Sequence, residues 1–429
     1  MRALQLKSST AILWSLALCA AGARAAAPDL AQALRDSSYE IHLHEGELDG
    51  VGRAFILKAA HDAQFVALGE DHNNRDVPPF TLALLRLLKQ AEGFEYLALE
   101  QDPVMMQRVS QPPARGNAAA INALAVQYLM GFTFDSDQEL GMLAQAGALL
   151  EGKGRPIWGC DQAFGVTHIV DELGRYAPSD KIRRDIESVR AEAAHAEAKR
   201  DLSTHTYIQS DAFAGALLKL KDALSGTSSD RAAFLLDALA RSAEIYGYYF
   251  AGERGEIPGY YSNNAVREEY LKSRFLAEYR FAEQQDGRAP KVLLKFGHYH
   301  LYRGLSPTNV LSLGNLASDL ARAHDLKLFS IALYAFNANG GKQGYGPFAA
   351  SDSSRFLGVF AAAAPANGWA VLDLRPLREY PYFRALSAAQ PDMTADARED
   401  LKRLVYGFDA LLMMGNSAAA THTLTQVAY

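Results

Sequence analysis

The sequence predicts an α/β fold in which helices sandwich a mainly parallel sheet that carries an all-helical insertion. Several short runs rich in branched apolar residues are typical of buried strands, and their continuous apolarity favours a sheet covered on both faces. Helical stretches separate these runs, and a strand–helix rhythm favours parallel pairing. A long region without any such run accounts for the insertion.

The predicted elements follow one another along the chain. The strands are Gln64–Gly69, Tyr96–Glu100, Pro156–Cys160, Val292–Phe296, Lys327–Leu333 and Ala370–Leu374. Helices are expected over Phe80–Lys89 and Asn117–Met130. From about 179 to 282 the chain is rich in Ala, Glu, Arg and Lys, so this region is the predicted insertion, acting as a lid or as simple packing. After Arg375 helix is expected again, and residues from Asn416 onward are expected to be loosely held.

Residues 1–25 have the features of a signal peptide. Arg2 and Lys7 precede the apolar run Ala11–Gly22, and Ala23-Arg24-Ala25 has the small-x-small pattern of a cleavage site. The apolar run is too short to span a bilayer comfortably and no comparable run follows, so no retained membrane segment is expected. The sequence therefore predicts a periplasmic or secreted protein, with residues 26–429 forming a single domain.

Composition limits the partners of this chain. Residues 1–25 contain three basic and no acidic residues, so their removal changes the formal net charge from -6 to -9. An acidic surface opposes binding to nucleic acid or anionic lipid. The expected partner is a small-molecule substrate. Only Cys160 remains after processing, which excludes an internal disulfide and favours an ordinary buried cysteine.

The strongest candidate for chemistry follows the strand Gln64–Gly69. Glu70 and His72 come directly after it, where open α/β sheets face their ligand crevice. A carboxylate beside a histidine raises the basicity of the imidazole and fixes its orientation, as a general base requires. Gly69 is expected to permit a sharp turn. The structural alternative is a helix cap by Asp71, with His72 on the surface.

Two more predicted strands end in carboxylates. Glu100 lies at the rim of a buried strand, where an ionised side chain implies a charge partner or a ligand. Its structural alternative is a salt bridge to an arginine such as Arg75. Asp161 follows a third strand and is either a supporting site residue or a local cap.

A fourth strand is followed by Gly297 and two histidines, His298 and His300. In extended geometry both imidazoles would share one side, as a metal or polar centre demands, whereas a turn would separate them. One of the two is then structural. His298 is the favoured site residue because it directly follows the strand and the glycine.

These strand ends resemble the superfamily that groups erythromycin esterases with ChaN haem-binding and Tiki-type proteins. The likeness runs from about Leu48 to Leu333 and rests on four short motifs. They are Gly69-Glu70-Asp71-His72, Phe94 to Glu100, Asn263 to Glu268 with Arg267, and His298-Tyr299-His300 with Ser312-Leu313-Gly314. The esterases place one more residue between the first Glu and His and space the late histidines three apart. Here both spacings are two, closer to the ChaN and Tiki side.

The resemblance implies an α/β sandwich with a helical insertion and functional roles for Glu70, His72, Glu100, Arg267 and His298. As a hydrolase of an ester, lactone or amide, the protein would use His72 as base, Glu70 to orient it and His298 to steady the oxyanion. A metal-assisted variant would use His72, Glu100 and His298 as ligands of a divalent metal. The alternative function is haem or iron binding through a histidine or tyrosine.

Overall fold

The computed structural model describes residues 29–199, 206–336, 352–360, 363, 365 and 368–425. The predicted signal peptide therefore lies outside the described residues. The described chain forms a nine-stranded sheet with the order β2-β1-β8-β9-β7-β3-β6-β4-β5. The strands are β1 (Ser38–His44), β2 (Glu47–Asp49), β3 (Ala63–Glu70), β4 (Tyr96–Leu99), β5 (Ile157–Gly159), β6 (Val292–Gly297), β7 (Lys327–Phe336), β8 (Trp369–Asp373) and β9 (Ala410–Gly415).

The sheet is mainly parallel, as predicted. The run from β9 to β5 is parallel throughout, whereas β8 is antiparallel to β9 and β1 is antiparallel to β8. All six predicted strands are present. The prediction of helix after Arg375 is wrong in part, because β9 pairs with both β7 and β8 inside the sheet.

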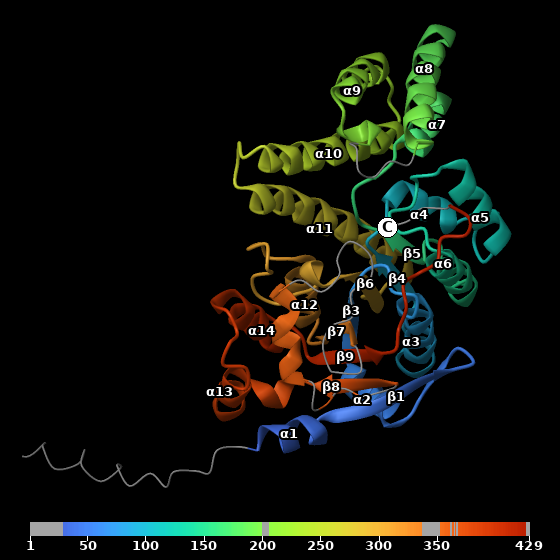
Figure 1. Ribbon diagram of the computed structural model, residues 1–429. Helices are drawn as coiled ribbons and strands as arrows, with labels where there is room; N and C mark the ends of the chain where they lie inside the picture. Colours follow the sequence, from blue (N-terminus) through green and yellow to red (C-terminus); the bar gives the residue numbers. More distant parts are fainter. Residues whose placement is uncertain are drawn as a thin grey trace, which may run out of the picture.

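Helices cover both faces of the sheet (Figure 1). They are α1 (Leu30–Asp36), α2 (Val51–Ala60), α3 (Val77–Glu92), α4 (Pro103–Val109), α5 (Ala118–Gln127), α6 (Asp137–Leu149), α7 (Thr167–Leu173), α8 (Asp180–Glu197), α9 (Asp211–Leu224), α10 (Asp230–Glu253), α11 (Gly259–Asp286), α12 (Leu313–Ala323), α13 (Tyr380–Ala388) and α14 (Ala395–Gly407). No described helix is both long and apolar enough to cross a lipid bilayer.

The central strand β3 explains the continuous apolarity of the sequence. All eight of its residues are buried. Val66 and Leu68 belong to a core shared with α2, α3 and α6, whereas Phe65 and Ala67 belong to a second core shared with α11, α12 and α14. Since successive side chains of a strand point to opposite faces, two covered faces require apolar residues at every position.

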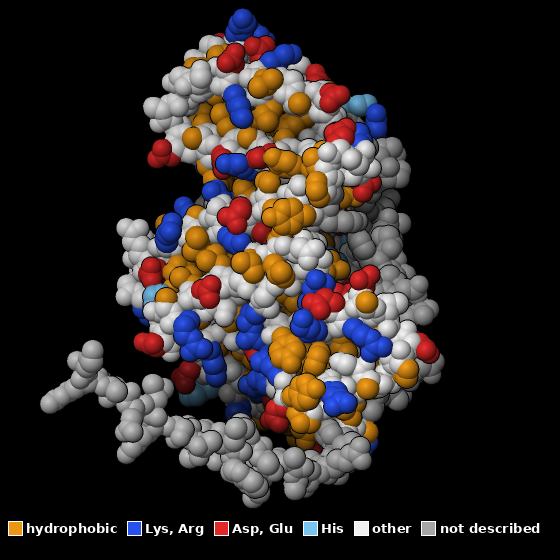
Figure 2. Space-filling view, turned by 90° about the vertical axis from the view of Figure 1, so that its left-hand side faces the viewer, with side chains coloured by type: hydrophobic (Ala, Val, Ile, Leu, Met, Phe, Trp, Pro, Cys, Tyr) orange, Lys and Arg blue, Asp and Glu red, His pale blue; other side chains and the backbone are white. Residues whose placement is uncertain are grey.

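The helical insertion lies between β5 and β6. Its helices, α7 to α11, span residues 167–286, which is longer at both ends than the predicted 179–282. Phe213, Leu220, Leu235 and Leu239 are buried in a third core that belongs mainly to these helices. Figures 1 and 2 show the insertion as an upper lobe above the α/β body, with charged and hydrophobic side chains interspersed over the face drawn in Figure 2.

The expectation of a loose end from Asn416 is wrong for residues 416–425. After β9 this segment runs along the loop that follows β3 and then reaches the start of α6 (Figure 1). The N–H of Arg75 donates to the Ala418 carbonyl oxygen and the N–H of Ala420 donates to the Asn73 carbonyl oxygen, both at 2.9 Å. Backbone hydrogen bonds of this kind hold residues 416–425, hereafter the C-terminal segment, against the body.

Candidate active site

Glu70 and His72 are joined at the carboxyl end of β3. Glu70 is the last residue of the strand and is 4% exposed. His72 follows two residues later, and the chain reverses after it at Asn73, whose φ of 61° is left-handed. Nδ1 of His72 lies 3.1 Å from Oε1 of Glu70, while a quarter of the His72 side chain remains exposed. The carboxylate can only accept, so Nδ1–H donates and the ring orientation is fixed.

The turn is not made by Gly69, contrary to the prediction. Gly69 lies inside β3, paired with Phe296 on one side and Ala332 on the other. A Cβ at this position would approach the ring of Phe408 to 3.0 Å. Close packing against that ring, rather than a sharp turn, therefore accounts for this glycine.

Glu100 directly follows β4, and its carboxylate contacts residues from several other parts of the site. Its Oε2 accepts the Gly297 N–H at 2.7 Å and lies 3.7 Å from Nε2 of His72. Its Oε1 accepts from Nη2 of Arg267 at 2.6 Å and lies 3.3 Å from Nε2 of His300. Because Glu100 is only 3% exposed, this set of donors is what stabilises its charge.

Arg267 on α11 joins the insertion to the strand ends. Nε and Nη2 of its guanidinium bind Asp161 at 2.9 and 2.6 Å, and Nε also binds Gln162 at 2.9 Å. Asp161 is fully buried, so it is part of the site rather than a local cap. Glu100 does form the salt bridge to an arginine that its structural alternative describes, but the arginine is Arg267. Arg75 is half exposed and pairs with Asp76 instead.

The two late histidines face different partners because a 3-10 turn, His298–His300, follows β6. His300 contacts Glu100 and binds Glu268 through Nδ1 at 2.5 Å. Nε2–H of His298 instead donates to the Leu333 carbonyl oxygen at 2.9 Å, and its ring stacks on Tyr334. His300, rather than the favoured His298, is therefore the histidine that contacts Glu100.

The buried Lys295 lies on the other side of Glu70. Its Nζ is 2.8 Å from Oε2 of Glu70 and also binds Glu139 of α6. Lys295 is 2% exposed, and the two carboxylates compensate its charge. Glu70 thus uses one oxygen to hold the lysine and the other to hold His72.

These contacts shift the pKa values of the site. Burial raises the pKa of Glu70, but the charge of Lys295 and the bond to His72 outweigh this and lower that pKa to about 2. Burial lowers the pKa of His72, yet the charges of Glu100 and Glu70 raise it overall. Burial likewise lowers the pKa of His300, which Glu100 and Glu268 raise to about 10. His300 therefore stays protonated through neutral pH.

A second wall of the site comes from residues just before α6. The Phe134 ring stacks on the imidazole of His72, with centroids 4.4 Å apart. The side chain of Gln101, the residue after Glu100, binds the Phe134 carbonyl oxygen and the Thr133 N–H at 2.9 and 2.8 Å. The strand end that carries Glu100 thus also positions the aromatic face that holds His72.

The C-terminal segment ties both walls together. Ser417 binds Asn74 and Asp76 in the loop after β3, both at 2.5 Å. Thr421 binds Asp137 through its hydroxyl at 2.7 Å, and the Asp137 N–H donates to the Thr421 carbonyl oxygen at 2.8 Å. One stretch of chain therefore spans from the loop that bears His72 to the helix that follows Phe134.

The proposed metal ligands do not form a metal site. Within the described residues, no group of three or more His, Cys, Asp or Glu side chains could hold a metal ion. The expected set of His72, Glu100 and His298 is separated because Nε2 of His298 binds the Leu333 carbonyl oxygen. Glu100 already accepts from Gly297 and Arg267. The ligand geometry thus disagrees with a metal centre built from these three residues.

Cys160 is the buried cysteine that the sequence predicts. Its side chain is fully buried, and burial raises the pKa of the thiol well above its ordinary value. A thiol with a raised pKa carries little thiolate and is a poor nucleophile.

Sequence reasoning missed four residues that contact the candidate site, namely Lys295, Glu139, Glu268 and Phe134. Two of them leave a signal in the sequence. Lys295 interrupts an otherwise apolar strand, and a buried lysine requires carboxylate partners. Glu268 directly follows Arg267, and its Oε2 accepts the N–H of Leu313 at the start of α12.

No family model matches the sequence, and no curated protein matches it. Solved structures do match. A succinoglycan biosynthesis protein aligns with a TM-score of 0.54 at 14% identity, covering 93% of this chain and 99% of that one. An erythromycin esterase, EreC, in an open conformation aligns with a TM-score of 0.54 at 14% identity, covering 90% and 99%. The chain therefore shares the fold of these proteins, which confirms the fold that the resemblance implied.

A haem-bound ChaN of Campylobacter jejuni also matches, with a TM-score of 0.29 at 11% identity. It covers 70% of this chain and 91% of that chain. A likeness at that level carries no argument about haem binding by this chain.

Proposed function

We propose that this chain is a hydrolase that cleaves an ester, lactone or amide by activating water at His72. The observation that supports this most strongly is the way His72 is held. Nδ1 is bound by Glu70, Nε2 lies toward Glu100, and the side chain is a quarter exposed. A partly exposed histidine that a carboxylate orients through one nitrogen has the arrangement of a general base.

The proposed reaction uses the neutral form of His72. Nε2 takes one proton of a water molecule while the water oxygen attacks the carbonyl carbon of the substrate. Glu70 stabilises the imidazolium that forms, because it accepts from Nδ1. The same proton is then delivered to the leaving oxygen or nitrogen as the tetrahedral intermediate collapses. The products are an acid and an alcohol or amine.

The developing oxyanion needs a donor, and we assign this role to Arg267 in place of His298. Nε2–H of His298 is engaged by the Leu333 carbonyl oxygen. Nε and Nη2 of Arg267 hold Asp161, Gln162 and Glu100, whereas Nη1 takes part in none of these bonds. A guanidinium fixed on two of its nitrogens is preorganised to donate from the third.

The test is a screen of p-nitrophenyl esters, lactones and aryl amides with the purified protein, followed by His72→Ala. Loss of a general base typically lowers the rate about a hundredfold to ten-thousandfold. Rates are compared per folded molecule, because loss of the Phe134 stacking and of the Glu70 hydrogen bond also lowers stability. His195→Ala, on the exposed face of α8, is the matched control and should retain full activity. A His72→Ala variant that melts early but keeps its rate per folded molecule contradicts the proposal.

The proposal includes export to the periplasm or the medium. It rests on the basic residues Arg2 and Lys7, the apolar run and the Ala23-Arg24-Ala25 pattern. N-terminal sequencing of protein from an expressing cell should begin at Ala26. An intact Met1, or lipid on Cys19 within the apolar run Ala11–Gly22, contradicts export as a soluble protein.

A further inference from the structure

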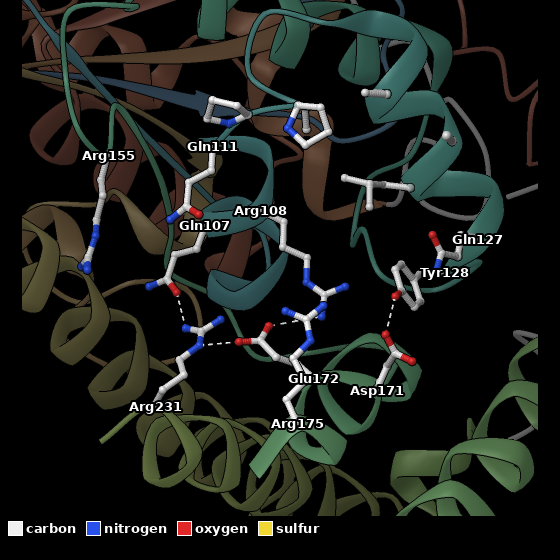
Figure 3. Close-up of a pocket in the computed structure, with 16 residues that line it drawn as sticks. Gln107, Arg108, Gln111, Gln127, Tyr128, Arg155, Asp171, Glu172, Arg175 and Arg231 are labelled. Atoms are coloured by element: carbon white, nitrogen blue, oxygen red, sulfur yellow. Dashed lines mark hydrogen bonds and ion pairs between the residues drawn. The ribbon is translucent and has the colours of Figure 1, made fainter. Parts of the chain in front are cut away.

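A cavity of about 700 Å³ lies between the α/β body and the helical insertion. Its walls come from α4 and α5 on one side and from α7 and α10 on the other (Figure 3). Small-molecule sites typically have volumes of about 300 to 1,000 Å³ and often lie between packed units of a fold. The cavity therefore has both the size and the position of a ligand site.

This cavity is separate from the candidate active site. Arg231, which lines it, is at the start of α10. Tyr246, whose hydroxyl interacts with Gln162 of the candidate site, lies further along the same helix. At 1.5 Å per residue, positions 231 and 246 of a helix are about 22 Å apart. A ligand of the cavity would not occupy the site at His72.

The cavity lining carries an excess of positive charge. Four arginines line it, while Asp171 and Glu172 are its acidic residues. These are Arg108, Arg155, Arg175 and Arg231. Asp171 is already bound by the Tyr128 hydroxyl and by Arg190, each at 2.8 Å. The lining thus brings together more guanidinium groups than its own carboxylates neutralise.

Two of the arginines are held side by side. Glu172 accepts from Arg108 at 3.2 Å and from Arg231 at 2.6 Å, and Arg231 also binds Gln107 (Figure 3). The guanidinium of Arg108 lies over the Tyr128 ring, 5.1 Å from its centroid. Hydrogen bonds and stacking fix the guanidinium planes of Arg108 and Arg231. Binding of an anion to their other N–H groups therefore costs little additional side-chain conformational entropy.

The positive charges of the other two arginines are less well neutralised by nearby carboxylates. Arg155 stacks on the Phe281 ring at 4.0 Å, and its closest ion pair, to Glu278, is 3.7 Å long. Arg175 is exposed at the cavity and forms no ion pair with any residue that the structure describes. Planar guanidinium groups match carboxylate and phosphate oxygens, to which they donate two parallel hydrogen bonds.

We propose that this cavity binds a small organic anion that carries at least two carboxylate or phosphate groups. The clamp of Arg108 and Arg231 receives one group, and Arg155 or Arg175 receives another. The volume of the cavity is far larger than a single phosphate ion requires, so the ligand has an organic body as well. This inference is independent of the hydrolase proposal, because it uses none of the residues at His72.

The test uses isothermal titration of the mature protein at low salt with two probes, citrate and pyrophosphate, and with acetate as a monovalent reference. We expect saturable one-to-one binding of at least one probe, weakened by added sodium chloride because the contacts are ionic. Binding of citrate alone assigns a carboxylate ligand, and binding of pyrophosphate alone assigns a phosphate ligand. Absence of saturable binding for both probes overturns the proposal.

The matched variants locate the binding. The double variant Arg155→Ala/Arg175→Ala should weaken probe binding at least tenfold. It leaves the Glu172 bridge between Arg108 and Arg231 in place, because neither residue belongs to that bridge. Arg183→Ala/Arg184→Ala removes two exposed charges of α8 outside the lining and should leave the affinity within twofold. Equal weakening by both double variants, or by neither, also overturns the proposal.

Discussion

The imidazole of His72 lies face to face on the ring of Phe134, with an interplanar angle of 24°. The two residues come from different parts of the fold, since His72 follows β3 and Phe134 precedes α6. A carboxylate therefore holds the edge of the imidazole and an aromatic ring holds its face. Four predictions test this description of the site.

The pH dependence of hydrolysis should report the pKa of His72. The base must be neutral to accept a proton, and its pKa is raised from the ordinary 6.5. We expect kcat/KM to increase with pH through a limb whose apparent pKa is above 6.5. Glu100→Gln removes a charge that raises this pKa, so its limb should move to lower pH. The control is Glu47→Gln, which changes an exposed carboxylate of β2 and should leave the apparent pKa of the limb unchanged. If neither variant shifts this apparent pKa, His72 is not the base.

Gly297→Ala should disturb the base without removing any charged group. A Cβ at Gly297 would lie 2.7 Å from Nε2 of His72 and 3.3 Å from Oε2 of Glu100. Displacement of the imidazole should lower kcat about a hundredfold, as misplacement by about 1 Å does in other enzymes. The control is Gly141→Ala on α6, where a Cβ meets nothing within 4 Å. Steady-state kinetics that are equal for both variants would show that the imidazole can move freely.

Lys295→Met should destabilise the fold in a pH-dependent way. Loss of the buried lysine leaves Glu70 and Glu139 without their cation, which costs about 3–5 kcal/mol of unfolding free energy at neutral pH. The pKa of Glu70 is lowered to about 2, so its stabilising contribution is complete above about 4.5 and is lost as pH falls toward 2. The deficit of the variant should therefore shrink over that interval. Denaturant unfolding at each pH measures this difference in unfolding free energy. The double variant Lys295→Met/Glu139→Gln should recover part of the stability, because it removes one of the two unpaired carboxylates.

Removal of residues 416–429 should reduce activity while keeping β9 intact. This truncation deletes the bonds of Ser417 and Thr421 to the two walls of the site. We expect kcat/KM to fall at least tenfold, because both His72 and Phe134 lose their support. A chain that ends at Thr425 keeps every described contact of the C-terminal segment and is the control. Equal kcat/KM values for the two truncated proteins would mean that the C-terminal segment packs against the body without supporting the site.

The sequence predicted the central strands well because apolar runs that are buried on both faces have a simple signature. It did not reveal β9. Ala410–Gly415 is short and rich in leucine and methionine, residues that helices also favour, and it directly follows the helix α14. Periodicity alone does not separate a buried strand from a buried helix in so short a run.

Residues of the site that directly follow a strand could be predicted from the sequence, whereas those whose position depends on a turn could not. Glu70, His72, Glu100 and Arg267 were predicted from their places in the motifs, and the structure brings all four together. The choice between His298 and His300 depends on a 3-10 turn that no propensity of those residues dictates. Phe134 lies just before α6 and Glu139 lies in its first turn, and only tertiary packing brings them to the site.

The position of β9 also determines the order in which the molecule can be assembled. Among the described strands, the hairpin of β1 and β2 joins the sheet through β8 alone, and β8 joins β7 through β9 alone. The β1–β2 hairpin, residues 38–49, can therefore join the sheet only after β9, residues 410–415, has been synthesised and has paired. During synthesis most of the chain leaves the ribosome before its sheet can be completed. Long-range pairing of this kind slows folding and leaves strand edges exposed, so nascent chains of this protein should depend on chaperones that shield them.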